Sequence, residues 1–336
     1  MHMADALVSP PVATGMAVAS LAVGAYSIFR IKKENKPENI PVMGVMGAFV
    51  FATQMVNFTI PGTGSSGHLC GGLLLSALIG PYGGFLSMMA ILLLQCLLFA
   101  DGGLMAYGCN VWNMAFYACF FGYFCIYKPI LSKNPSKKKI LIASILGSIL
   151  SLQLGAFSVT LETLISGVTE LPFLTFLSFM QPIHLAIGFV EGLITSAVLI
   201  FVYNTRPEML NINEKSNEFS FKKVIAILGI VTVLIGGGIS LLASSSPDGL
   251  EWSMENVAGS TELDSKGSAY DKASEIQEKT AILPDYSISN FNNEVLGTSF
   301  SGIVGSVLVA VILIGGSLIF RFYKKGAKNE QTRKSA

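Results

Sequence analysis

The sequence predicts an all-α polytopic membrane protein. Of its 336 residues, 51% are apolar and only 13% are charged, and the mean hydropathy is +0.60. A soluble protein carries about 25% charged residues. Several long stretches contain no Asp, Glu, Lys or Arg, and they reach the length of about 17–25 residues that a helix needs to cross the apolar core of a bilayer. We therefore expect many membrane-spanning helices.

Nine apolar segments are the expected spans. The third and fourth are short, and Pro81, Gly83 and Gly84 lie where one ends and the other begins. Because such residues interrupt helices, this pair is either two half-length helices or one broken helix. The nine segments cover residues 8–29, 40–58, 70–80, 84–100, 104–127, 140–165, 174–203, 223–243 and 299–320.

Lysine and arginine residues predict the topology. Nineteen of the 22 fall into four clusters, and counting the short pair as two spans puts all four clusters on one side of the membrane. Cytoplasmic loops are enriched in these residues, so we expect the N-terminus outside and the C-terminus in the cytoplasm. The clusters are Arg30, Lys32, Lys33 and Lys36; Lys128, Lys133, Lys137, Lys138 and Lys139; Arg206, Lys215, Lys222 and Lys223; and Arg321, Lys324, Lys325, Lys328, Arg333 and Lys334.

The chain is predicted to consist of two membrane units. Residues 1–205 form a compact domain of about seven helices, and residues 206–222 form a polar cytoplasmic linker. Residues 223–322 form a second unit of two spans around an outer loop, 244–298, which holds ten acidic residues and three lysines. Acid-rich loops are usually solvated, so no ligand is assigned there, and residues 323–336 are a basic cytoplasmic tail.

Composition and motifs exclude several functions. The net charge of +1 argues against a nucleic-acid partner. The chain has no GxxxxGK[ST] phosphate loop, no HExxH and no GxSxG motif, so we do not expect an enzyme. The five cysteines, at 70, 96, 109, 119 and 125, lie in or beside apolar stretches. We expect them to be small buried residues and not disulfide partners.

Two of the three histidines are predicted to share the outer face. His2 follows the α-amine of Met1, and His68 ends the glycine-rich loop PGTGSSGH. The amine, the amide nitrogen of His2 and its imidazole Nδ1 can close fused chelate rings around a metal ion, and His68 can add a fourth nitrogen. Such a set suits Ni²⁺ or Cu²⁺ and accommodates Co²⁺. The alternative is a solvated tail residue and an ordinary loop residue. No basic residue precedes Arg30, unlike in a secretory signal, so we expect this N-terminus to be retained.

Four further residues are candidates for ion transfer or for structure. His184 and Glu191 lie seven residues apart on one face of a predicted span, where ionisable groups are either functional or an interior polar pair that holds helices together. Asp101 is expected at the outer end of a span, where it attracts cations or caps a turn. Cys70 is either a soft metal ligand or a small buried residue, the second being favoured.

Several motifs resemble one known family. MHMADAL, NFTIPGTGSSGHLCGGLL, ALIGPYGG, LLFADGGLMAYGCNVWNM and IHLAIGFVEGLIT occur in this order over residues 1–203. Together they resemble the substrate-capturing membrane subunit, of the CbiM/NikM type, of cobalt and nickel energy-coupling factor transporters. ASSSPDGLEW and GTSFSGIVG, over residues 223–320, resemble the small CbiN/NikN partner subunit, here fused into the same chain.

The resemblance implies a protein of the prokaryotic cell membrane that binds Co²⁺ or Ni²⁺ as transported cargo, with no permanent cofactor. Its ligands are then Met1, His2 and His68, and Asn57 and Ser66 are candidates to orient His68. Its implied partners are a transmembrane coupling subunit and cytoplasmic ATPase subunits. The alternative is a proton-driven secondary transporter that uses His184 and Glu191. The loop reads GTGSSGH where the family more often has GGTSGH, and Cys70 replaces a usual aliphatic residue, which puts loop geometry and metal preference in question.

Overall fold

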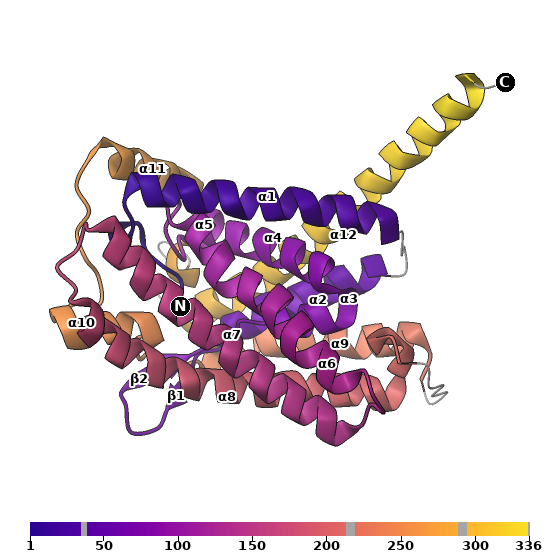
Figure 1. Ribbon diagram of the computed structural model, residues 1–336, viewed down its shortest axis with the longest axis horizontal. Coiled ribbons are helices and arrows are strands. Elements are labelled where there is room, and N and C mark those ends of the chain that lie inside the picture. The colour runs from indigo at the N-terminus through magenta and orange to yellow at the C-terminus, as the bar shows by residue number, and fades with distance from the viewer. Residues whose placement is uncertain (35–38, 213–218, 288–293, 335–336) are drawn as a thin grey trace.

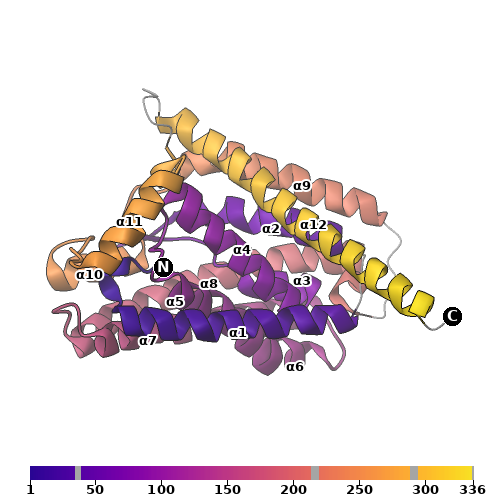
Figure 2. The ribbon, with the colours of Figure 1, turned by 90° about the horizontal axis from the view of Figure 1, so that it is seen from above.

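The computed structural model describes residues 1–34, 39–212, 219–287 and 294–334, and nearly all its regular structure is helical. The long helices lie roughly along one direction (Figures 1 and 2). The first unit contains η1 Asp5–Leu7, α1 Pro10–Glu34, α2 Asn39–Gln54, β1 Phe58–Ile60, β2 Ser65–Gly67, α3 Gly72–Ile79, α4 Pro81–Phe99, α5 Tyr107–Asn110, η2 Val111–Tyr127, α6 Lys128–Leu131, α7 Lys137–Ser166 and α8 Phe173–Thr205.

The second unit packs against the first along α2. In Figure 2, α9 and α12 lie side by side next to α2, while the hydrophilic segment between them covers one end of the molecule. This segment, expected as a loop, forms two helices. The elements are η3 Pro207–Leu210, α9 Phe221–Gly237, η4 Ile239–Leu242, α10 Gly249–Ala258, α11 Ser268–Thr280, η5 Pro284–Tyr286 and α12 Glu294–Lys334.

Seven helices of the described residues are long and apolar enough to cross a membrane, which confirms the predicted class of fold. α5, η2 and α6 join into one of them, and its central part, Val111–Tyr127, winds as a π-helix. α2 is apolar but has only 16 residues. α3 has eight residues, about 12 Å of helix at 1.5 Å per residue. The predicted span 70–80 is therefore a half-length helix and not a full one.

The two short segments are separated by a sharp break. Gly80 adopts φ 82°, in the region that favours glycine, and Pro81 starts α4. Gly71, at the other end of α3, adopts φ 83°, and all eight residues of α3 are buried. Ile79 and Gly80 line a pocket together with Glu34 and Arg206, so α3 ends near the ends of α1 and α8. The chain thus runs toward that end of the fold over α3 and turns back over α4.

The predicted basic clusters gather at one end of the fold. The ends of α1 and α8 and the starts of α7 and α9 lie toward the right in Figure 1, as does the C-terminal part of α12, whereas the N-terminus, α10 and α11 lie toward the left. Lys36 and Lys215 belong to this prediction but lie outside the described residues. The arrangement agrees with counting the short pair as two passes.

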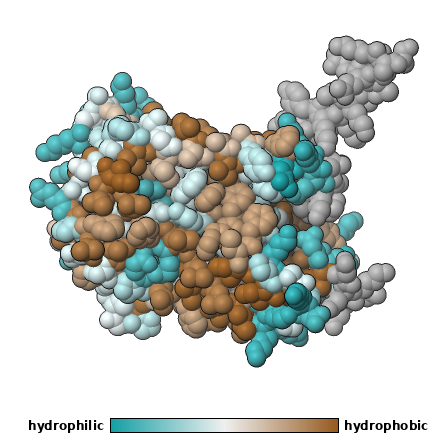
Figure 3. All heavy atoms as spheres, in the orientation of Figure 1, coloured by the Kyte–Doolittle hydropathy of each residue, from teal (hydrophilic) through white to brown (hydrophobic). Residues whose placement is uncertain are grey.

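Small residues allow close helix packing. A Cβ on Gly192 of α8 would lie 2.5 Å from Cα of Ile145 of α7, and one on Gly188 would lie 2.9 Å from Cα of Ile149. Close backbone approach at small residues is how helices associate in lipid, where no hydrophobic effect drives them together. Large apolar side chains such as Leu174 and Val18 instead point outward. On the face of the molecule drawn in Figure 3, hydrophobic residues lie in the middle and hydrophilic residues lie mostly toward both ends.

Candidate metal site

The N-terminal segment is inserted into the protein and is not a solvated tail. Met1 is 7% exposed, and Met3 is fully buried. The amide of Met3 donates to Oδ1 of Asn110 at 2.6 Å, and Nδ2 of Asn110 donates back to the carbonyl of Met3 at 3.1 Å. The amide of Gly103 donates to that same carbonyl at 3.0 Å. These bonds hold Met1 and His2 in a fixed place.

The three predicted ligands lie together. The α-amine of Met1 donates to Nε2 of His68 at 3.2 Å. The imidazole rings of His2 and His68 stack with their centroids 5.3 Å apart and an angle of 21° between their planes. Nδ1 of His68 lies 3.2 Å from the carbonyl of Leu69. A carbonyl only accepts, so Nδ1 carries the proton and Nε2 presents a lone pair toward Met1, as a metal ligand requires.

The loop that carries His68 has defined geometry. β1 and β2 form an antiparallel hairpin in which Phe58 pairs with Gly67 and Ile60 with Ser65. Gly62 and Gly64, in the turn between them, adopt φ 79° and 78°, which only glycine reaches without strain. The hairpin therefore places His68, directly after β2, at the inner edge of the loop next to the N-terminus.

A residue of the second unit joins the site. Oδ2 of Asp248 forms an ion pair with the α-amine of Met1. Its Oδ1 accepts from the amides of Leu250 at 2.8 Å and Glu251 at 3.0 Å, and Oε2 of Glu251 accepts from the amide of Asp248 at 3.0 Å. This reciprocal capping box starts α10. Sequence reasoning missed Asp248, although the D-x-x-E spacing ahead of Leu250 and Met254 is the signal for such a helix start.

Burial and charge set the protonation of the site. Burial, the Met1 ammonium and His2 lower the pKa of His68 to about 3. Burial also lowers the pKa of His2, although Asp101 partly offsets it. Burial raises the pKa of Asp248, but the Met1 ammonium and His68 outweigh that effect, and the pKa falls below its ordinary value. Both imidazoles are therefore neutral near pH 7, which is the form that binds metal ions.

Asp101 lies in the site, next to His2. Nδ1 of His2 lies 3.1 Å from Oδ1 of Asp101, and Nε2 of His2 lies 3.2 Å from Oε1 of Gln95. The hydroxyl of Tyr286 donates to Oδ2 of Asp101 at 2.5 Å. Because the predicted chelate uses Nδ1 of His2, its closure requires the contact with Asp101 to be released or the ring to turn.

Asn57 and Ser66 do not hydrogen-bond the ring of His68 in the described residues. Ser66 is fully buried. Its amide donates to the carbonyl of Pro247 at 2.8 Å, and its hydroxyl donates to that of Ser246 at 2.7 Å. The carbonyl of Asn57 accepts from the amide of Ser244 at 2.7 Å. Both residues therefore attach the hairpin to the segment that carries Asp248, through bonds that do not involve the ring of His68.

His184 and Glu191 do not contact each other. Nδ1 of His184 lies 2.8 Å from the carbonyl of Met180. Glu191 accepts from the amides of Cys70 at 3.0 Å and Gly71 at 3.1 Å. The first amides of a helix have no partner within it, and at the start of the half-length helix α3 the buried carboxylate of Glu191 is that partner. Glu191 therefore ties α8 to the start of α3, as expected of a polar group that holds helices together, and His184 takes no part in that contact.

Four of the five cysteines are buried, as predicted, whereas Cys125 is exposed, contrary to the prediction. All five are free. Cys70 lies two residues after His68 in the sequence, and its thiol donates to the carbonyl of Met114 at 3.1 Å. Within the described residues there is no group of three or more His, Cys, Asp or Glu side chains that could hold a metal ion. The candidate site at the N-terminus differs from such a cluster, because two of its four nitrogens are the α-amine of Met1 and the main-chain amide of His2.

An acidic cleft leads to two of the three predicted ligands. His2 and His68 line it, and among the described residues in its walls there is no Lys or Arg. Carboxylates of one sign in a cleft raise the local concentration of cations. Six acids line the cleft: Asp5, Asp101, Asp248, Glu251, Glu262 and Asp285.

Comparison with known proteins identifies the family. Residues 2–209 match the family described as the cobalt uptake substrate-specific transmembrane region, and residues 222–322 match the PDGLE domain, whose five letters stand here at residues 247–251. With seven long apolar helices among the described residues, the chain is a multi-pass membrane protein. It belongs to the cobalt uptake family and carries a PDGLE domain in the same chain.

Relatives share this arrangement. A putative fused nickel transport protein NikMN of Archaeoglobus fulgidus is 33% identical, over 93% of this chain and 96% of its own. A probable fused nickel transport protein LarMN of Lactiplantibacillus plantarum is 31% identical, over 76% of this chain and 79% of its own. The crystal structure of a truncated transition metal transporter is 29% identical with a TM-score of 0.53, and it covers 60% of this chain and 98% of its own.

Proposed function

We propose that this chain captures Ni²⁺ or Co²⁺ at its N-terminus for uptake across the membrane. The observation that carries the proposal is the convergence of the Met1 amine, His2 and the neutral His68 imidazole in one buried place. The names of the relatives, which are nickel and cobalt transport proteins, support the same cargo. The ligands are the Met1 amine, the amide nitrogen and imidazole of His2, and Nε2 of His68.

Capture proceeds by exchange of protons for the ion. A hydrated cation enters the acidic cleft, and the amine and the amide of His2 give up protons as the chelate rings close, so binding is strongly pH-dependent. The imidazoles need lose no proton because they are already neutral. Asp248 holds the amine in place before capture, and its negative charge afterwards balances part of the charge of the ion. Four nitrogens in one plane favour Ni²⁺ on ligand-field grounds, whereas Co²⁺ is accommodated.

The proposed orientation puts the metal site outside the cell. The basic ends of α1, α7 and α9 then face the cytoplasm of a prokaryotic cell, in line with the enrichment of Lys and Arg on that side. The C-terminal end of α12 is cytoplasmic as well. Cations thus reach the acidic cleft from outside, and the bound ion leaves toward the basic end.

Energy comes from other subunits in this proposal. The sequence has no phosphate loop for ATP, and the chain works with a transmembrane coupling subunit and cytoplasmic ATPase subunits. The protein is then a transport component and not an enzyme. The proton-driven alternative requires Glu191 to exchange protons, but that carboxylate already holds two amides at the start of α3.

The test is metal uptake by cells that produce a chain with one extra residue ahead of Met1. The extra residue turns the amine of Met1 into a peptide nitrogen and displaces the terminal amine from His68, so uptake should fall to background. One alanine inserted after Ser132, in an exposed connection at the other end of the fold, is the matched control and should leave uptake unchanged. Unchanged uptake by the N-terminally extended chain would rule out the terminal chelate.

A further inference from the structure

A second cavity borders the candidate chelate, next to the acidic cleft. His68 and Asp248 line both spaces, but the remaining walls differ. The cleft is lined by loops and by residues of α10 and α11, whereas the cavity is lined by Met1, Met114 and Leu152 and by His184 of α8. It has room for about one water-sized particle. The candidate chelate therefore borders this small space directly, through Met1 and His68.

His184 points a free ring nitrogen into this space. Its side chain is 1% exposed, and Nε2 has no hydrogen-bond partner among the described residues. Nδ1 lies 2.8 Å from the carbonyl of Met180, so Nδ1 carries the proton and Nε2 is left with a lone pair. Histidines that ligate metals use this same arrangement, in which one nitrogen donates to a carbonyl and the other binds the ion. A buried lone pair without a partner is otherwise unfavourable.

The glycine of the PDGLE sequence keeps that nitrogen accessible. A Cβ on Gly249 would lie 3.3 Å from Nε2 of His184, 3.1 Å from its Cε1 and 2.9 Å from Cδ1 of Ile187. Any side chain at this position would therefore press against the ring and fill the cavity. The first turn of α10 thus closes the cavity without occupying it.

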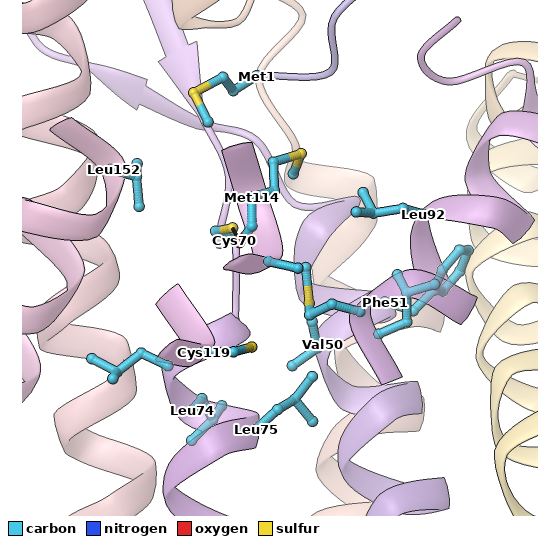
Figure 4. Packing of buried hydrophobic residues seen from close by; sticks show 14 of the residues in the cluster. Met1, Val50, Phe51, Cys70, Leu74, Leu75, Leu92, Met114, Cys119 and Leu152 are labelled. Atoms are coloured by element: carbon cyan, nitrogen blue, oxygen red, sulfur yellow. Dashed lines mark hydrogen bonds between the residues drawn. The ribbon is translucent and has the colours of Figure 1, made fainter. Parts of the chain in front are cut away.

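Sulfur atoms complete the walls. Cys70 is 4% exposed and Met114 is 1% exposed, and both line the cavity with His184. Figure 4 shows Cys70 and Met114 close together inward of Met1, with Cys119 deeper still. Imidazole and sulfur donors bind late transition metals but have little affinity for Mg²⁺ or Ca²⁺. The cavity therefore has the donors for the same class of cation as the chelate, in a softer set.

We propose that this cavity is a second, transient site for the transported ion, formed by Nε2 of His184 and the sulfur atoms of Cys70 and Met114. The thiol of Cys70, which donates to the carbonyl of Met114 in the metal-free protein, releases its proton to water when it binds the ion as a thiolate. This second site rests on the proposed function, because the ion reaches it from the chelate. Nε2 of His68 faces the chelate and its ring also lines the cavity, so this ring passes the ion inward. Since the cavity holds about one water-sized particle, the ion enters it without its hydration shell.

The test uses the full chain, purified in detergent, with Co²⁺ as the probe. One residue added ahead of Met1 removes the chelate. The extended chain should keep a weaker Co²⁺ site with a sulfur-to-cobalt charge-transfer absorption. Loss of a residue that only hydrogen-bonds a metal ligand costs about 10–100-fold in metal affinity. His184 would be a ligand itself, so His184→Ala in the extended chain should weaken Co²⁺ binding by at least about tenfold. Met114→Leu, which removes sulfur at nearly constant volume, should reduce the absorption and keep the fold.

Thr195→Val is the matched control. Thr195 is fully buried on α8, and its hydroxyl lacks a hydrogen-bond partner among the described residues, but it does not line the cavity. It should leave Co²⁺ binding unchanged. The proposal is overturned if the extended chain binds no Co²⁺, or if Met114→Leu and a folded His184→Ala leave affinity and absorption as they were. The chain with a free Met1 tests the chelate separately, because it must bind Co²⁺ more tightly than the extended chain whatever the cavity does.

Discussion

At the scale of single residues, the site is a balance of one buried ammonium, the carboxylates of Asp248 and Asp101, and two neutral imidazoles. The side chains of Met1 and Asp248 are 6% and 14% exposed, so neither charge is well solvated. A charge in such a place is stable only with a partner. Burial, aided by the Met1 ammonium, lowers the pKa of both imidazoles and keeps them unprotonated, and so the burial of the N-terminus also prepares the ring nitrogens to bind a cation.

Asp248→Asn tests the ion pair with Met1. Asparagine still caps a helix, but it removes the charge that the ammonium faces. Hydrogen bonds to charged groups contribute about 1.5–3 kcal/mol, and we expect the free energy of unfolding without metal to fall by that amount. Chemical denaturation in detergent measures it. Glu251→Gln, which alters the capping box and leaves the ion pair, should cost less than about 1 kcal/mol, and equal losses in the two variants would argue against the pair.

His68 makes stability depend on pH. Its pKa is lowered to about 3 in the folded protein from about 6.5 in the unfolded chain. Between these values the unfolded chain binds a proton that the folded protein does not, so the free energy of unfolding decreases as the pH falls, by up to about 1.4 kcal/mol per pH unit. His2 contributes in the same direction. Unfolding measured from pH 7 to pH 4 should show this slope, and His68→Gln should flatten it. A slope unaffected by that substitution would contradict the assignment.

At the scale of elements, two short pieces of backbone depend on side chains elsewhere. The half-length helix α3 begins inside the protein, where Glu191 satisfies its first amides. The N-terminal segment has no helix of its own before η1, and Asn110 and Gly103 hold it. Each piece is positioned by hydrogen bonds and not by its own periodicity.

Glu191→Gln distinguishes a structural carboxylate from a proton carrier. Glutamine has one acceptor oxygen and no negative charge, so it cannot replace the two charged oxygens that accept from the amides of Cys70 and Gly71. We therefore expect the free energy of unfolding to fall by about 1–3 kcal/mol. Metal uptake should decline only in proportion to the folded protein in the membrane. Loss of uptake with unchanged stability would instead support the proton-driven alternative.

Gly103→Ala tests how the N-terminus is held. A Cβ there would lie 1.9 Å from Oδ1 of Asp5, so Asp5 and the residues before it must move. We expect Ni²⁺ affinity to fall by at least about tenfold, as when supporting contacts of a metal site are lost, with the helix content unchanged in circular dichroism. Gly15→Ala is the matched control, since a Cβ there meets nothing within 4 Å. Equal Ni²⁺ affinity in the two variants would show that this contact is unimportant.

At the scale of the whole molecule, the second unit completes a site of the first. Met1 and Asp248 are 247 residues apart, and α10 packs on α8 directly beside the hairpin that carries His68. The acidic segment is therefore part of the site and not only a solvated loop. Fusion in one chain keeps Asp248 at a fixed, high local concentration next to the amine.

Sequence patterns predicted most of the helices, because long apolar segments have few alternatives in a membrane. They also predicted that His2 and His68 come together, through topology and family motifs. They left open whether the short pair is two half-length helices or one broken helix, since the apolar pattern around α3 does not show where its backbone amides find partners. Asp248 was missed for a related reason: its local role as a helix cap is visible in sequence, but its contact with Met1 depends on packing between distant parts of the chain.

The most direct test of the central claim is X-ray absorption of the full chain loaded with one equivalent of Ni²⁺. The account predicts four nitrogen donors in a plane, including two imidazoles, and no sulfur or carboxylate oxygen at bonding distance. One residue added ahead of Met1 should abolish this spectrum. A first coordination shell of oxygens, or one that contains sulfur in the chain with a free Met1, would contradict it.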